Sequence, residues 1–469
     1  MTGPSGRRRR LAVLGICGLS LFMTYLDNTI LNVALPAIQN SLHCSLTALQ
    51  WVMDAYLLVL GSLLLLAGAT GDRLGRRRLF LCGVLVFTAG SALCSVAVNL
   101  STLIAARVVQ AVGGAALTPT SLSIVRDVFR EPVERDKALG VWSGIFGVAT
   151  ACGPLAGGLL VSAAGWRSVF WVNLPLGLAT WVLARRFVPE SRASRPRRTD
   201  PLGQGLMVVF LTALTYALIQ APRDGWANPL IVTGFVLAAV ALTAFVVAEL
   251  RQRQPMLDLR YFRNLPFAGA NVIALLAFVA LAGFLLINTL YLQQERGLSA
   301  RWTGLALLPA TVAIAVGGLV GGRWVARRGP RLPLMTAGLC ITAGSAVLLG
   351  LRATTPYAEI ALAYVLLGAG FGLVNPPITS TAVSGMPADQ AGVASAVAAT
   401  ARQFGNALGV AVLGALLAAG LGSSAGPNSL SAATHLPWAF LCFDGLAITA
   451  VAVLATRRRP GGSARRTAR

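Results

Sequence analysis

A few charged and amide side chains interrupt stretches of this sequence that are otherwise apolar and long enough to cross a membrane. Asp27 lies in one such stretch, and Asn28 and Asn32 follow it. The two asparagines are four residues apart and share one face of a helix, with Asp27 beside that face. A carboxylate within a membrane costs about 2.5–3.5 kcal/mol, so Asp27 should face a partner or a cavity. It can then carry a proton, or serve as a structural hydrogen-bond acceptor for a neighbouring helix.

Two further charges lie in other apolar stretches. Asp54 follows about one helical turn after the start of its stretch, where it could be a second proton site, a substrate contact or an acid near the outer surface. Arg107 stays charged when buried and needs an anionic or carbonyl partner. Asp27 and Asp54 are the candidates for that partner. A structural ion pair is the alternative to a functional one.

A glycine-rich charged turn joins the second and third apolar stretches. Glycines there permit a tight turn and a close approach of helices. The acid and the arginines can bind neighbouring helix ends and release them, which predicts a cytoplasmic gate; anchoring by positive charge alone explains neither the glycine spacing nor the acid. The candidate gate residues are Gly68, Asp72, Arg73, Gly75 and Arg76.

The fifth apolar stretch carries the cluster Gly153, Pro154, Gly157 and Gly158. Small residues let helices touch closely, and proline bends a helix. Glycines alone are typical of membrane helix packing, whereas this combination is more particular.

Other polar residues give weaker signals. His43 and His435 are isolated, and the seven cysteines are scattered, so we expect no metal site and no disulfide framework. Without a nucleophile, base or metal constellation, a membrane enzyme is not expected. Arg402 is expected near the cytoplasmic side of its helix, held by carbonyls or water, with substrate binding as the alternative. Asp444 is left unassigned.

The elements that must position these residues are membrane-spanning helices. Of the 469 residues, 56% are hydrophobic and 12% are charged. Apolar stretches of about 18 residues or more recur along the chain, which is the length of a transmembrane helix. We predict fourteen helices, near residues 11–35, 47–67, 79–98, 101–125, 138–163, 168–188, 203–221, 227–249, 266–291, 302–322, 333–351, 357–377, 391–419 and 436–456.

The basic residues sit between these helices and define an orientation. The net charge is +23, but no folded basic surface is indicated, so nucleic acid is not an expected partner. Most of the 39 Lys and Arg residues fall in every second connection and at both ends of the chain. The positive-inside rule then places both termini in the cytoplasm. The cluster Arg7 to Arg10 precedes a long apolar stretch and is expected to begin an uncleaved first helix.

The chain also resembles itself. Arg107 to Pro119 is echoed by the glycines around Gly370 and by Pro376, and the turn after Gly68 has a weak echo near Gly329. Paired halves are typical of secondary transporters. We therefore divide the chain into residues 1–190, a six-helix half; 191–264, an inserted helix pair with basic linkers; 265–456, a second six-helix half; and 457–469, a basic tail.

Six motifs in order carry a resemblance to a known family. They are Leu26 to Pro36, Gly68 to Arg77, Arg107 to Gly113, Gly153 to Gly158, Trp166 to Pro175 and Ala401 to Gly405. With them the chain resembles the major facilitator superfamily, and within it the fourteen-helix drug:proton antiporter branch of the EmrB/QacA type. Ala111 departs from the motif, which usually has glycine after Gln110.

The resemblance implies an all-α integral membrane protein with two six-helix bundles and two inserted helices. It implies export of small amphipathic drugs or antibiotics across the cytoplasmic membrane, driven by protons without a cofactor. Asp27 and Arg107 would serve proton coupling, Asp72 and Arg76 the gate, and Gly153 and Pro154 the direction of exchange. A nutrient symporter, a channel and a scaffold are the alternatives. A monomer is expected.

The cargo is not readable from the sequence. Aromatic residues that could line a pocket, or instead face lipid, are Phe22, Tyr25, Trp51, Trp142, Phe146, Phe284 and Tyr291.

Overall fold

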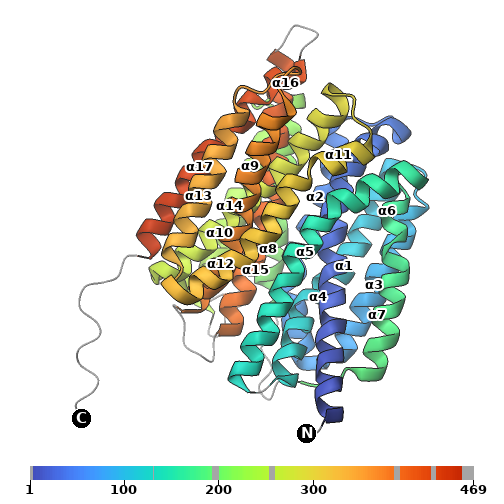
Figure 1. The fold of residues 1–469 in the computed structure, drawn as a ribbon, viewed down its shortest axis with the longest axis vertical. Coiled ribbons are helices and arrows are strands. Elements are labelled where there is room, and N and C mark those ends of the chain that lie inside the picture. Colours follow the sequence, from blue (N-terminus) through green and yellow to red (C-terminus); the bar gives the residue numbers. More distant parts are fainter. Residues whose placement is uncertain are drawn as a thin grey trace.

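The computed structural model is a bundle of long helices that run roughly parallel to one another (Figure 1). It describes residues 4–129, 131–192, 200–252, 259–384, 391–423 and 429–456, and these ranges contain no strand. The elements are α1 (Pro4–Leu42), α2 (Leu46–Leu74), α3 (Arg76–Ser95), α4 (Leu100–Val128), α5 (Pro132–Ala164), α6 (Ser168–Trp171), α7 (Asn173–Phe187), α8 (Pro201–Asp224), α9 (Pro229–Arg251), η1 (Leu259–Arg263), α10 (Leu265–Leu290), η2 (Tyr291–Glu295), α11 (Ala300–Ala306), α12 (Leu308–Arg328), α13 (Arg331–Leu348), α14 (Tyr357–Ser384), α15 (Ala391–Ser423), α16 (Ser429–Ala433) and α17 (His435–Ala455).

The fourteen predicted stretches are helical apart from their ends and a few breaks. Within the described residues, 13 helices are long and apolar enough to cross a membrane. The sixth stretch falls short because it is two helices, α6 and α7, separated at Val172. Pro175 follows the break; it has no N–H to donate, and its ring would collide with the carbonyl of Trp171. The prediction of one continuous helix over residues 168–188 is therefore wrong.

A helix break followed by a proline also interrupts two later stretches. Pro309 follows the break at Leu307 between α11 and α12, and Pro437 follows the break at Thr434 between α16 and α17. All three breaks lie near the start of a spanning segment, where few backbone hydrogen bonds are lost.

The packing of α1–α7 is repeated in α10–α17. α1 packs against α5 as α10 packs against α15, α3 against α4 as α13 against α14, and α3 against α7 as α13 against α17. The helix caps repeat as well. Ser45 caps the start of α2 and Gly75 its end; in the second half, Ser299 caps the start of α11 and Gly329 ends α12. Two large buried apolar clusters lie mainly in the first and in the second half, and the first extends across the contact into α10 and α15. The chain is thus built as two similar six-helix bundles.

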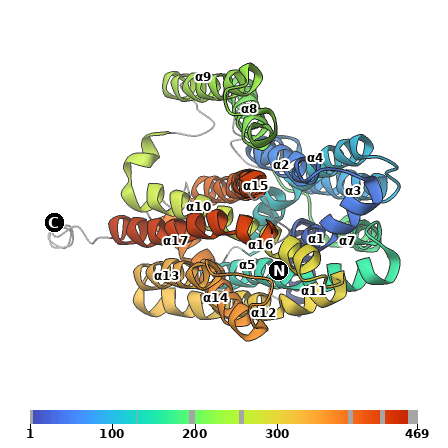
Figure 2. The ribbon, with the colours of Figure 1, turned by 90° about the horizontal axis from the view of Figure 1, so that it is seen from above.

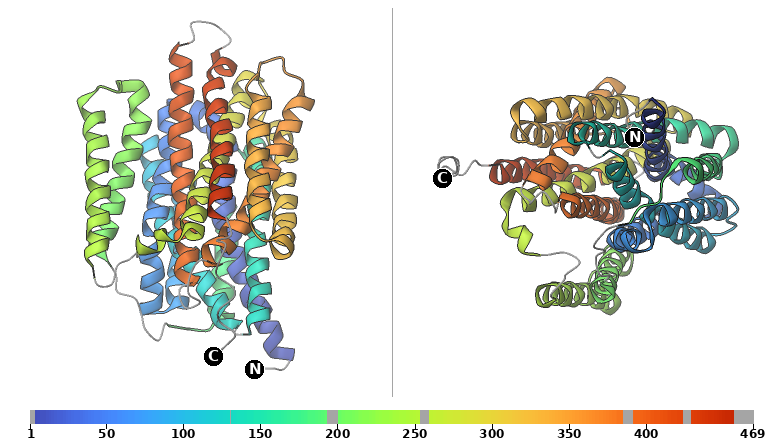
Figure 3. Two further views of the ribbon diagram at one scale, coloured as in Figure 1. Left: turned by 90° about the vertical axis from the view of Figure 1, so that its left-hand side faces the viewer. Right: turned by 90° about the horizontal axis from the view of Figure 1, so that it is seen from below.

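The two halves meet along two seams. One seam is α5 against α11 and α12, and the other is α2 against α15. The inserted pair lies at the edge of the bundle (Figure 2): α8 packs against α2 and α15, and α9 packs chiefly against α8. We use "terminal face" for the end of the bundle where α1 begins, and "opposite face" for the end where α11 begins (Figure 3).

Candidate functional site

A buried polar cluster lies inside the first half, among α1, α4 and α7. Arg107 on α4 donates from Nη1 to Oδ2 of Asp27 on α1 at 2.6 Å and to Oε1 of Gln110 at 2.7 Å. Gln110 Nε2 donates to Oδ1 of Asp27 at 2.7 Å, and Asn173 Nδ2 at the start of α7 donates to the same oxygen at 2.7 Å. The Asp27 carboxylate therefore accepts three hydrogen bonds, one of them from a cation.

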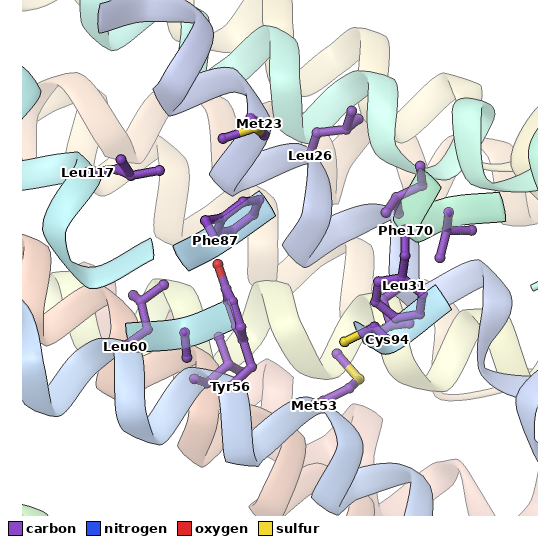
Figure 4. Packing of buried hydrophobic residues seen from close by; sticks show 14 of the residues in the cluster. Met23, Leu26, Leu31, Met53, Tyr56, Leu60, Phe87, Cys94, Leu117 and Phe170 are labelled. Carbon is purple, nitrogen blue, oxygen red and sulfur yellow. The ribbon is translucent and has the colours of Figure 1, made fainter. Parts of the chain in front are cut away.

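Arg107 is held from several further directions. Its Nε donates to the carbonyl of Val52 at 3.4 Å, and its guanidinium lies 4.0 Å from the centre of the Tyr56 ring. The side chains of Asp27 and Arg107 are each only 1% exposed. Buried apolar residues pack together inside the first half (Figure 4), with Tyr56 and Phe87 close together. A buried ion pair is tolerable only with such complete hydrogen bonding.

The structure decides between the two predicted partners of Arg107. Asp27 is the partner, whereas neither carboxylate oxygen of Asp54 has a hydrogen-bond partner among the described residues, although Asp54 is fully buried. Asp54 is four residues after Gln50, which donates to Val410 O at 3.2 Å, and seven before Gly61, which lies against Phe404. It therefore shares the face of α2 that packs on α15.

Sequence reasoning left three members of the cluster out of the candidate site. Gln110 is three residues after Arg107 and so on the same side of α4, which is a readable signal. Asn173 was noticed only within a motif, and it lies 146 residues from Asp27 in the chain. Ser91 accepts from Asn173 Nδ2 at 3.1 Å and donates to Phe170 O at 2.9 Å. A serine in a membrane helix gives no signal by itself.

Asn28 and Asn32 belong to a different site from Asp27. They face a central cavity of about 20 Å³ between the halves, with space for about one water molecule. The wall consists of Tyr25, Asn28, Thr29, Asn32, Met53, Leu57, Thr150, Phe278, Leu281, Ala282, Leu285, Asn406 and Val410. Asp27 and Asn28 are neighbours on α1, so the buried carboxylate and the cavity wall share one turn of helix.

The aromatic candidates for that wall are mostly elsewhere. Tyr25 lines the cavity. Phe284 and Tyr291 are fully buried in the apolar cluster of the second half, and Trp51 lies against Tyr216 of α8. The side chains of Trp142 and Phe146 fall outside the described residues.

The glycine-rich turn is bound to its own half at the terminal face. Arg76 donates to Oδ1 of Asp72 at 3.0 and 2.8 Å, and it pairs with Asp127 at the end of α4. Gly75 has φ +116°, and a Cβ there would lie 2.7 Å from a carboxylate oxygen of Glu190, so only glycine fits. Asp127 and Glu190 are partners that the sequence did not single out.

The two other gate candidates are Gly68 and Arg73. Gly68 would place a Cβ 3.6 Å from Pro119, which is ordinary contact, and Arg73 is exposed.

The cluster on α5 joins three helices. A Cβ on Gly153 would collide with Thr29, and one on Gly157 would lie 2.7 Å from the carbonyl oxygen of Ile30, so these glycines seat α1. A Cβ on Gly158 would collide with the carbonyl of Ala300, and a Cβ on Gly304 would collide with the carbonyl of Pro154. The cluster therefore holds α1 on one side and α11, from the second half, on the other.

Further contacts close the opposite face between the halves. Gln293 Nε2 donates to Val33 O at 2.9 Å, and Gln294 Nε2 donates to Oε1 of Gln39 at 2.8 Å. They border a groove of about 1030 Å³ between the ends of α1 and α5 and the start of α11.

Arg402 and Asp444 are intramembrane charges outside these clusters. Contact of Arg402 with carbonyls or water stays a prediction; its buried Nη1 has no acceptor among the described residues. Asp444 on α17 is 2% exposed, and the part of the chain that the structure describes offers neither of its oxygens a donor.

The chain is similar in sequence to known proteins. The pattern of the Major Facilitator Superfamily matches residues 17–410. The multidrug resistance protein Stp of Mycobacterium tuberculosis is 39% identical over 421 residues, covering 90% of this chain and 78% of that protein. The tetracenomycin C resistance and export protein of Streptomyces glaucescens is 38% identical over 424 residues, covering 90% and 78%.

The fold is also similar to solved structures. A bacterial homologue of the human lysosomal transporter Spinster, in an inward-facing and unoccupied conformation, superposes with a TM-score of 0.68 at 18% identity, covering 98% of this chain and 100% of that one. The human organic anion transporter MFSD10 gives a TM-score of 0.64 at 16% identity, covering 94% and 99%. At such identities the likeness concerns the fold alone.

Proposed function

Because the chain belongs to the Major Facilitator Superfamily, we propose that it is a proton-coupled antiporter that exports small amphipathic drugs or antibiotics. It is a multi-pass membrane transporter and not an enzyme. Relatives that match most of its length are named for multidrug resistance and for antibiotic resistance and export. The observation that carries the proposal is the buried Asp27 carboxylate, bound by three donors beside the central cavity.

Protonation of Asp27 is the coupling step in this proposal. A proton on the carboxylate removes the negative charge that Arg107 faces and replaces an acceptor by a donor. Arg107 remains held by Gln110 Oε1, Val52 O and the Tyr56 ring, so the cation stays in place while its bond to α1 weakens. α1 is then freer to move against α4.

Movement of α1 reaches both the cargo and the seam. Asn28 forms part of the cavity wall, while Thr29 and Ile30 rest on the glycines of α5. The same α5 segment touches α11 of the second half. A proton at Asp27 is thus linked through one helix to the cavity and to the contact between the halves, which is what alternating access requires.

The orientation follows from the basic connections. We place the terminal face in the cytoplasm of the producing cell, with energy supplied by the proton gradient across the cytoplasmic membrane. A monomer that uses no cofactor remains a prediction.

The experiment is proton-driven transport by the purified protein in liposomes. A pH gradient of the correct sign should drive uptake of an amphipathic dye into vesicles that contain inside-out protein. Asp27→Asn keeps the side-chain shape but cannot carry the proton, so gradient-driven uptake should fall at least about tenfold while dye binding persists. Asp224→Asn, at the exposed end of α8, is the matched control.

Transport that is indifferent to the pH gradient would disprove the proposal. Full gradient-driven activity of Asp27→Asn would remove Asp27 from the coupling step.

A further inference from the structure

Arg402 lies on the face of α15 that borders the central cavity. Asn406, four residues later and therefore one turn further along the same face, is part of the cavity wall. Tyr25 of α1, which lines the cavity, lies within electrostatic range of Arg402. Because α15 begins at the terminal face, Arg402 lies about one turn closer to that face than the cavity wall at Asn406.

This cation is unpaired, unlike Arg107. Arg107 has a carboxylate, an amide oxygen and a carbonyl as acceptors, whereas Arg402 forms no ion pair and its buried Nη1 has no acceptor in the described ranges. The rest of its side chain is partly exposed. An unpaired intramembrane arginine is costly to keep and is expected to face a binding site. Its guanidinium offers a planar set of donors suited to a carboxylate or another anionic oxygen.

The cavity provides no negative charge of its own. The residues of its wall are apolar, aromatic, hydroxyl or amide side chains, and none is acidic. The nearest buried carboxylate along α1, Asp27, points into the first half and is occupied by three donors. Asp54 on α2 is buried without a hydrogen-bond partner among the described residues, but it is not part of the cavity wall. A cationic cargo would therefore meet Arg402 without a compensating acid in the wall.

The other end of the cavity offers an acceptor. The Oδ1 atom of Asn32 is buried and has no donor among the described residues. Tyr25 and Asn32 are seven residues apart on α1, which corresponds to about 10 Å along a helix. Apolar side chains line the space between them: Met53, Leu57, Phe278, Leu281, Leu285 and Val410.

We propose that the cargo is an amphipathic organic acid whose anionic oxygen, a carboxylate or an ionised phenol or enol, is bound by Arg402. Its apolar body lies between α2, α10 and α15, and a hydroxyl or N–H group reaches Asn32 Oδ1. This inference rests on the proposed function and adds the charge of the cargo to it. The cavity must widen to admit such a molecule, so binding is coupled to separation of the halves.

The test compares an anionic with a cationic dye on the full-length protein. Binding of fluorescein and of ethidium is measured by fluorescence anisotropy in detergent, and transport of each is measured in liposomes with and without a pH gradient. Arg402→Gln, Arg402→Lys and, as a matched control at the exposed opposite face, Arg352→Gln are prepared. Near-ultraviolet circular dichroism and size-exclusion elution establish that each variant is folded.

The wild-type protein should bind fluorescein more tightly than ethidium. Arg402→Gln should weaken fluorescein binding about tenfold or more, because a charge-assisted hydrogen bond is lost, and should raise KM more than it lowers kcat. Arg402→Lys should retain part of the affinity, and Arg352→Gln all of it. If Arg402→Gln does not fold, the lysine variant and the dye preference of the wild type still decide.

The outcomes separate this inference from the proposed function. Proton-driven export of ethidium with no binding of fluorescein overturns the inference and leaves the antiporter intact. Fluorescein binding that depends on Arg402 without any response to the pH gradient supports the inference and overturns the antiporter. Equal fluorescein affinity of folded Arg402→Gln and wild type overturns the inference.

Discussion

Asp27 and Arg107 form a unit in which each charge is buried because the other is present. Taking either charge out of water is costly, and their attraction repays this only when the remaining donors and acceptors are satisfied. Gln110 performs both tasks, since it accepts from Arg107 and donates to Asp27. The unit should therefore respond to substitution as a whole and not residue by residue.

Neutralising one charge should be worse than neutralising both. Arg107→Gln leaves the Asp27 carboxylate buried without its cation, and a loss of about 3–5 kcal/mol is expected for a broken buried pair. Adding Asp27→Asn removes the orphaned charge and should restore part of the stability. Thermal unfolding of purified Arg107→Gln, Asp27→Asn and the double variant in detergent checks this order. A double variant no more stable than Arg107→Gln would contradict it.

The charged members of this unit were predictable from sequence, and its amides largely were not. An acid and a base within apolar helices have few places to find a partner, which points each toward the other. Asn173 gives no such signal, because neutral amides often occur in helices, and its contact with Asp27 depends on how α1 and α7 pack. The lack of a hydrogen-bond partner, among the described residues, for the Asp54 carboxylate and for Nη1 of Arg402 likewise depends on packing between the halves.

At the scale of elements, α5 is the part most constrained by shape. Its glycines present bare backbone to α1 on one side and to α11 on the other, and a side chain at those positions has no room. Helix contacts of this kind rely on small residues because packing, not hydrophobicity, joins helices in lipid.

Alanine substitutions at two glycines of α5 should have opposite effects. Gly158→Ala would place a methyl group against the Ala300 carbonyl, so it should shift α11 and lower the transport rate several-fold. Gly144→Ala on the same helix meets nothing within 4 Å and should stabilise α5 slightly, since alanine favours helices. Initial transport rates at matched protein amounts provide the comparison. Equal rates for the two variants would show that the α5–α11 contact is not functional.

At the turn between α2 and α3, exchanging the charges of Arg76 and Asp127 should restore transport that the change at Asp127 alone impairs. Arg76 joins Asp72 and Asp127, and its pairs are partly exposed, so each contributes about 1 kcal/mol or less to stability. Asp127→Arg should nevertheless slow transport, because α4 loses its link to the turn. Combining it with Arg76→Asp should recover a measurable share of the rate. No recovery in the double variant would mean that this pair is not an independent link.

The helix boundaries were also only partly predictable from the sequence. Hydrophobic length located every spanning segment. The breaks at Val172, Leu307 and Thr434 followed from prolines that the sequence displays, but their effect depends on whether the preceding turn is free to end there.

At the scale of the molecule, the two halves share packing but differ in polarity. Gly113 and Gly370 occupy matching positions against α3 and α13, and the same spacing aligns Arg107 with Tyr364. Tyr364 donates to Asn288 Oδ1 at 2.7 Å, so a neutral hydrogen bond lies where the first half has an ion pair. The proposed proton chemistry is therefore concentrated in one half, and the other half moves with it as a packed body.

Transport in this scheme needs the opposite face to open. The side-chain ends of Gln39 and Gln294 are bonded across the halves at 2.8 Å, so a short reducible bis-thiol cross-linker between Gln39→Cys and Gln294→Cys, in a Cys44→Ser background, should hold that face shut. Cross-linking should abolish transport, and a reductant that cleaves the linker should restore it. Each single cysteine variant is the control. Continued transport by the fully cross-linked protein would mean that this face does not open.

The position of the inserted pair has a practical consequence. α9 packs chiefly against α8, so only 22% of its apolar span is buried within the protein and lipid supplies most of its surroundings. The position of α9 therefore depends on the surrounding lipid as much as on contacts with the rest of the chain. Extraction into a small detergent should loosen α9 before any other span, and reconstitution into lipid nanodiscs should restore it. Preparations for structural work are best judged by the state of this helix.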